Sequence, residues 1–322
     1  MKTSEEDIIN VKSWMSLGDS NYEIDHDDDS IPESGVVYCN IEHIHKFFEK
    51  CYDTNNRYIV ISAFSDYGVA LQEEHPVASD MNKWLPFIEA EIPSIGYSPL
   101  VIPQRCEVDK CKITDRYSVK CHSSTYSTFN RIPNNVVKWF CVNSMIEDER
   151  IINIPLGIGK DAPSDIAEVC IPPSNPLKQS TSDRVNWVYV NWQGHTVERI
   201  KLKQALAKYD PHWATVVTEA KPYKEYLSDL CNHAFALCPE GNGIDCYRIL
   251  ECIYSGCIPV LKEKIAYNYL EDLPHLVIRD WSDLTFDFLK SELDRIQQDT
   301  YNFNKISLSY WKNKIEESRK LL

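Results

Sequence analysis

Between residues 185 and 278, short apolar runs alternate with longer amphipathic segments, and this alternation constrains the fold more than any other feature. The runs rich in β-branched and aromatic residues predict strands at 185–192, 215–218, 234–238, 257–261 and 275–278. The segments between them predict helices at 197–209, 223–231 and 246–255. Strands that alternate with helices pair in parallel, and helices then cover both faces of the sheet. The sequence therefore predicts an α/β fold.

The first half of the chain repeats this pattern less regularly. Short apolar runs predict strands at 36–38, 58–61, 98–102, 136–142 and 151–154, with a helix at 41–51. Four prolines and a polar run at 162–184 are typical of a linker. A chain of 322 residues exceeds one ordinary core, so we expect two domains. Their predicted bounds are an acidic N-terminal segment at 1–34, an N-terminal α/β domain at 35–162, a linker at 163–184, a C-terminal α/β domain at 185–300 and a C-terminal helix at 301–322.

The charge of the chain excludes several classes of function. There are 34 basic and 48 acidic side chains, which gives a formal net charge of −14. Binding to nucleic acid or to an anionic membrane surface requires clustered Lys and Arg, so neither partner is expected. Apolar runs stay far below the ~20 residues of a membrane span, and residues 1–10 do not resemble a signal peptide. We expect a soluble, cytoplasmic protein.

The sequence offers two weak metal-site candidates. Twelve cysteines are scattered along the chain, and without a secretory signal we expect reduced thiols that act as small buried hydrophobes. The spacing most like a zinc site involves Cys106, Cys111, Cys121 and His122. It lacks a Cys-x-x-Cys pair. Asp27 and Asp29 form an Asp-x-Asp pattern, but no buried strand precedes them. The prediction is that the protein holds no metal.

Residues 235–260 are the most informative stretch, and they predict a strand, a glycine loop, a helix and a second strand. Gly241 and Gly243 allow close approach of the backbone to a ligand, and allow positive φ. Asp245 is a good N-cap residue for the helix, and Gly256 suits its left-handed end. This arrangement is typical of a site that binds a phosphorylated ligand.

Arg248 and Glu251 fall on one polar stripe of the predicted helix. A guanidinium beside a helix N-terminus suits a diphosphate, and a carboxylate accepts hydrogen bonds from ribose. The alternative is an exposed intrahelical ion pair that contributes only ~0.2–0.5 kcal/mol. A dinucleotide-binding fingerprint, and with it hydride transfer, is disfavoured because Cys246 stands where the third glycine would be.

These motifs resemble the C-terminal signature of exostosin-like glycosyltransferases, namely Pro-x-Gly-Asn-Gly-x-Asp, Arg-x-x-Glu and Gly-Cys-Ile-Pro-Val. Residues 61–69, with Ser-Asp-Tyr, are similar to an N-terminal strand and loop of that family. Residues 139–157 resemble its Trp-Phe-x-x-Asn and Ile-Pro-x-Gly motifs. Tyr-Val-Asn-Trp at 189–192, followed by Thr196 and Arg199, looks like the first strand and helix start of its donor domain. The resemblance covers about two thirds of the chain, residues 57–262.

The resemblance implies a GT-B architecture, in which two Rossmann-like domains face a cleft and C-terminal helices pack back. The C-terminal domain would bind a UDP-sugar, and the N-terminal domain a glycan acceptor. The chain is similar to the compact, soluble versions of this family that large algal viruses encode, including a xylosyltransferase. UDP-xylose is therefore the expected donor.

The resemblance also implies a set of donor-site residues: Arg199, Pro239, Gly241, Asn242, Gly243, Asp245, Arg248 and Glu251. Arg199 and Arg248, with the loop amides, would neutralise the leaving diphosphate without a metal. For Arg199 the alternative is a solvated helix residue.

The candidate general bases are Asp66 and His75, in the loop after the strand at 58–61. We favour Asp66, because a rigid strand precedes it, and we expect an inverting reaction with a β-linked product. A catalytically inactive nucleotide- or glycan-binding module of the same fold, which needs no base, is the alternative.

Overall fold

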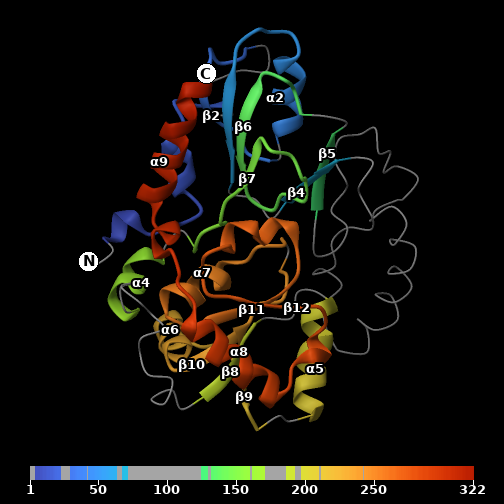
Figure 1. Cartoon of the computed structure of the whole chain (residues 1–322), viewed down its shortest axis with the longest axis vertical. Helices are drawn as coiled ribbons and strands as arrows, with labels where there is room; N and C mark the ends of the chain where they lie inside the picture. Colours follow the sequence, from blue (N-terminus) through green and yellow to red (C-terminus); the bar gives the residue numbers. More distant parts are fainter. Residues whose placement is uncertain are drawn as a thin grey trace, which may run out of the picture.

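The computed structural model describes residues 4–22, 30–41, 43–63, 67–71, 125–129, 132–159, 162–170, 186–192, 197–209, 212–241 and 243–322. Two five-stranded sheets, one above the other in Figure 1, form the framework of this part of the chain. Each sheet is parallel throughout. The described helices include none long and apolar enough to cross a membrane.

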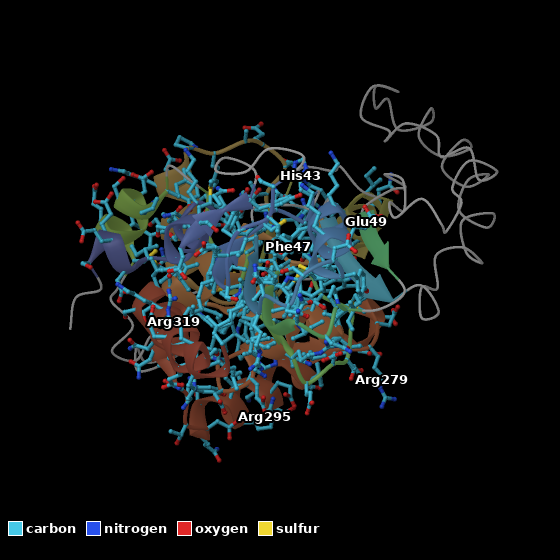
Figure 2. The ribbon with its side chains drawn as sticks, turned by 90° about the horizontal axis from the view of Figure 1, so that it is seen from above. His43, Phe47, Glu49, Arg279, Arg295 and Arg319 are labelled. Carbon is cyan, nitrogen blue, oxygen red and sulfur yellow. The ribbon has the colours of Figure 1, made fainter. Side chains whose placement is uncertain are left out.

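The N-terminal sheet has the strand order β1 (Ser20–Asn21), β2 (Gly35–Tyr38), β3 (Tyr58–Ser62), β6 (Val136–Cys141) and β7 (Ile151–Asn153). A separate parallel pair joins β4 (Tyr67–Leu71) to β5 (Thr125–Phe129). Helix α2 (Ile44–Cys51) packs against the sheet, where Phe47 meets Tyr22 and Tyr58 edge-on. Phe47 is fully buried and is labelled in Figure 2, which views the molecule from the end where α2 lies. Residues 98–102, predicted as a strand, lie outside the described ranges.

The C-terminal sheet has the order β12 (Leu276–Ile278), β11 (Ile258–Lys262), β10 (His233–Leu237), β8 (Asn186–Val190) and β9 (Ala214–Val216). The chain passes from β8 outward to β9 and then returns across β8 to β10. The strand order therefore reverses between β8 and β10. In parallel sheets the connections diverge at such a point and leave a crevice beyond the carboxyl ends of the two strands.

Helices cover both faces of the C-terminal sheet. Val188 and Val190 belong to a core cluster shared with α5 (Val197–Tyr209) and α8 (Phe286–Gln298). Tyr189, between them, belongs to a second cluster that includes α6 (Tyr223–Cys231) and α7 (Tyr247–Tyr254). This alternation is the period of two expected of a strand buried on both faces. The second cluster continues into the N-terminal sheet, so the two halves share one core.

Helix α9 (Leu308–Ser318) packs back against the N-terminal half, beside β2 in Figure 1. The rings of Trp311 and Trp14 meet edge-on at 5.9 Å between centroids. Arg319 forms a bidentate ion pair with Asp19, both contacts at 2.7 Å. The predicted α/β class is confirmed: each half is built on a parallel sheet, and the C-terminal end packs back on the N-terminal half.

Two segments contain structure that the sequence did not predict. In the N-terminal segment, η1 (Glu5–Asp7) and η2 (Ser13–Leu17) precede β1, and Ile9 and Trp14 are fully buried. Residues 4–22 are therefore part of the core and not a separate acidic segment. The predicted linker begins with helix α4 (Pro163–Val169), whose proline stands in the first turn, where its missing N–H is tolerated. The domain bounds themselves stay predictions.

The remaining short helices are η8 (Ile265–Leu270), η9 (Trp281–Asp283), η10 (Phe303–Ile306) and η11 (Arg319–Leu321).

Candidate functional site

The glycine loop lies at the reversal of strand order, because it follows β10 and leads into α7. Arg199 reaches the loop from α5, the helix after β8. Its Nε and Nη2 donate to the Pro239 carbonyl at 3.4 and 3.1 Å. A Cβ at Gly241 would lie 3.0 Å from the same guanidinium. Arg199 thus connects the two sides of the predicted crevice, and Gly241 lets the guanidinium pack closely against the loop.

Two details differ from the sequence interpretation. Gly241 does not have a left-handed φ, although Gly256 does, at +68°, as predicted. Arg199 is only 9% exposed, so the alternative of a solvated helix residue is wrong. The amphipathic pattern of α5 did not reveal this burial, because the loop that covers Arg199 comes some forty residues later in the chain.

Arg248 stands in the first turn of α7 and is half-buried. Its Nε is fully buried and has no hydrogen-bond partner in the described part of the chain. Buried polar groups in folded proteins are nearly always hydrogen-bonded, and a charged group without a partner is costly. A guanidinium whose buried Nε has no partner among the described residues, at a helix N-terminus beside a glycine loop, is typical of a site that an anion completes.

Glu251 does not form the exposed pair with Arg248 that was the alternative interpretation. It is 6% exposed, and its two carboxylate oxygens accept from the hydroxyls of Tyr223 and Tyr226 at 2.9 and 2.7 Å. Burial raises the pKa of Glu251, while Tyr226 and Arg248 oppose that shift. The predicted ribose contact stays a prediction, but Glu251 clearly fastens α7 to α6. The two tyrosines are one helical turn apart and so lie on one face of α6, but their spacing does not reveal which residue they meet.

Asp245 is not the N-cap of α7, as the sequence suggested. The N-cap residue is Cys246, which has no side-chain capping bond. The Asp245 carboxylate accepts instead from the Leu156 amide at 2.8 Å, and the Asp245 amide donates to Asn143 Oδ1 at 2.7 Å. Asp245 is 3% exposed, and burial raises the pKa of its carboxyl to about 6. Asp245 is therefore hydrogen-bonded to residues of the N-terminal half and does not cap α7.

This raised pKa gives a pH-dependent contribution to stability. The native carboxyl binds a proton below about pH 6, whereas in the unfolded chain its pKa is near 3.8. The native state therefore holds an extra proton between about pH 4 and 6, and the contribution of Asp245 to the free energy of unfolding falls as pH rises through that window. Asp245→Asn keeps an acceptor for Leu156 without the charge. We expect the unfolding free energy of the variant, minus that of the wild type, to rise by up to ~3 kcal/mol from pH 4 to 7.

Urea unfolding of both proteins at several pH values in that window measures the difference. Three other carboxyls have lowered pKa values, so their contributions to stability rise with pH: Asp19, Asp148 and Asp280. Both proteins contain them, so these contributions cancel in the difference between the two unfolding free energies. A difference that does not change with pH would contradict the assignment.

Several predicted residues lie outside the described ranges, so the structure does not place them: Asp27, Asp29, Asp66, His75, Cys106, Cys111, Cys121, His122 and Asn242. Asp66 and His75 stay predicted bases. Among the residues that are described, no group of three or more His, Cys, Asp or Glu side chains could hold a metal ion. All nine described cysteines are free thiols, and most are buried, as predicted for them.

A groove of about 630 Å³ runs along β7, the edge strand of the N-terminal sheet. It is bounded by the acidic turn at 147–149, by η8 and by α9. No residue of the predicted donor site lines it. The candidate site is therefore defined by the loop, Arg199 and Arg248, and not by this groove.

One comparison with known proteins covers most of the chain, and another covers residues 195–320. A solved structure of trehalose-6-phosphate synthase, from work on glycosyl transfer with retention, aligns with 91% of this chain and 75% of its own. The identity is 10% and the TM-score 0.37, which is too distant to support an argument. The model of the RXYLT1 C-terminal domain matches residues 195–320. This domain belongs to a GT-B-like glycosyltransferase, and the match contains every described residue of the candidate site.

Proposed function

We propose that this protein is a glycosyltransferase that binds a UDP-sugar at the carboxyl end of its C-terminal sheet and transfers the sugar to a hydroxyl of a glycan. The observation that carries the proposal is the buried, unpartnered Nε of Arg248 at the N-terminus of α7. A diphosphate would supply the missing acceptor oxygens and also interact favourably with the helix dipole. The match of residues 195–320 to the RXYLT1 C-terminal domain supports the same chemistry.

The finer part of the proposal concerns donor, mechanism and location. UDP-xylose is the favoured donor, because the matched domain is that of a ribitol xylosyltransferase. Arg248 and the loop amides would stabilise the charge that develops on the leaving diphosphate, with no metal required. A carboxylate or imidazole base, Asp66 or His75, would take the proton of the acceptor hydroxyl while its oxygen bonds to the anomeric carbon and UDP leaves from the opposite face, which inverts that centre. We place the enzyme in the cytoplasm.

A panel of nucleotides and nucleotide sugars tests the proposal. We expect UDP and UDP-xylose to raise the melting temperature, and GDP-mannose to have no effect, because a ligand that binds only the native state stabilises it. Slow hydrolysis of one UDP-sugar, unaffected by EDTA, would be the second expected result. If no UDP compound binds the folded protein, the proposed function is wrong. Activity lost in EDTA and restored by Mn²⁺ would contradict the metal-free mechanism.

The same panel separates the enzyme from an inactive binding module. Both would bind UDP, but only the enzyme needs a base, so only the enzyme should release UDP from its donor over time. Binding without any turnover, in the presence of a range of glycan acceptors, would favour the module.

A further inference from the structure

Two segments of the N-terminal half converge on the last residue before the N-cap of α7. Asn143 follows β6 and Leu156 follows β7, so both lie beyond the carboxyl ends of adjacent strands. Asn143 accepts from the Asp245 amide, and Leu156 donates to the Asp245 carboxylate. These contacts span 102 and 89 residues of sequence. The hydrogen bonds therefore connect the N-terminal sheet directly to the glycine loop.

The geometry of Asn143 suits this contact closely. The residue is 1% exposed and has a φ of 56°, in the left-handed region where Asn is among the few tolerated non-glycine residues. That backbone conformation places its side-chain oxygen 2.7 Å from the Asp245 nitrogen. Strained residues of this kind persist where surrounding structure fixes them, and they cluster at functional sites.

We propose that Asn143, the Leu156 amide and Asp245 form a clasp that positions the glycine loop and Arg248 for the donor. The inference rests on the proposed function, since it names residues that act on the same site. None of the three needs to contact the donor. They fix residue 245, which lies between the glycines of the loop and the first turn of α7 that carries Arg248. Donor affinity would then depend on residues of the N-terminal half.

Other contacts hold the two halves together without the clasp. Tyr254 Oη accepts from the Ile9 amide at 3.0 Å and donates to the Ile306 carbonyl at 2.6 Å. Asn153 Nδ2 donates to the Ile265 carbonyl at 3.0 Å. Loss of the clasp should therefore leave the halves docked. It would release the end of the loop next to α7, while Arg199 still holds the end next to β10.

The test measures UDP affinity by calorimetry in matched variants. Asn143→Gly removes the acceptor but accommodates the positive φ, and Asp245→Ala removes the carboxylate. We expect each to bind UDP roughly five- to twentyfold more weakly, as for the loss of one buried hydrogen bond. Asp245→Asn keeps an acceptor for Leu156 and should retain most of the affinity. Where a donor is turned over, the donor KM should rise more than kcat falls.

Asn135→Ala is the control, because Asn135 also holds buried backbone by its side-chain amide. It donates to the carbonyls of Cys51, Thr54 and Asn56, all within the N-terminal half. It should lower the melting temperature and leave UDP affinity unchanged. If the wild type binds UDP and both Asn143→Gly and Asp245→Ala bind it equally well, the clasp has no positioning role. If the wild type itself does not bind UDP, the proposed function has failed first.

Discussion

Replacing Arg248 with methionine should lower UDP affinity by about ten- to a hundredfold, measured by calorimetry, without lowering the melting temperature. The loss follows because hydrogen bonds to a charged partner contribute roughly 1.5–3 kcal/mol. The melting temperature should hold or rise, because the substitution removes a buried Nε that has no partner in the described chain and keeps an apolar side chain of similar length. The Arg248 variant is therefore expected to lose UDP affinity without losing thermal stability.

Arg295→Met is the matched control for Arg248→Met. Arg295 lies on α8 in the same half, its side chain is 55% exposed, and it pairs with Glu292 and Asp299. It projects from the rim of the molecule in Figure 2. UDP affinity should be unchanged in this variant, and stability should change little, as for most exposed ion pairs. Equal UDP affinity in the Arg248 and Arg295 variants would show that Arg248 does not meet the diphosphate.

Replacing Trp14 with alanine should lower the free energy of unfolding by about 3–5 kcal/mol, the cost of removing a large aromatic side chain from a packed core. Trp14 is fully buried, meets Trp311 edge-on and donates through Nε1 to the Pro155 carbonyl at 3.1 Å. The substitution would leave a cavity and deprive that carbonyl of its donor. Urea unfolding gives the difference directly.

Tyr52→Ala serves as the control for Trp14→Ala, because Tyr52 is 47% exposed and lies at the end of α2. Tyr52→Ala should lower the free energy of unfolding by much less than Trp14→Ala does. A loss below ~1 kcal/mol for Trp14→Ala would mean that residues 4–22 are not part of the cooperative core.

The sequence predicted the regular elements of the C-terminal half well. The bounds predicted for α5 and α6 are those observed, because both helices have polar or proline residues at their starts and clear apolar strands on either side. The N-terminal segment was missed for a physical reason. Ile9 and Trp14 lie in short 3₁₀ and bridge structures, which have no extended hydrophobic period, among many acidic residues. Helix α4 was missed because its segment is rich in proline.

The candidate site was predicted in its residue types better than in its contacts. Arg248 and Gly256 could be recognised from local spacing and turn chemistry. The partners of Asp245 and Glu251 could not be recognised, since they come from the segments after β6 and β7 and from α6, and depend on tertiary packing. The preference of Asp for the N-cap position favoured Asp245 as the cap of α7. In the structure its carboxylate instead accepts from the distant Leu156 amide.

The Trp14 ring packs against Trp311, and the Asp7 carboxylate accepts from the Ser309 amide at 2.7 Å. These contacts affect how the chain reaches its native state. Asp7 and Ser309 are 302 residues apart in sequence, so their contact closes a very long loop. On the ribosome, the N-terminal segment cannot complete its native packing until α9 has emerged, and its apolar side chains stay exposed to chaperones until then. Contacts of such long range slow folding, because they order most of the chain before they add stabilisation. The packing of residues 4–22 is therefore completed by a segment that is synthesised much later.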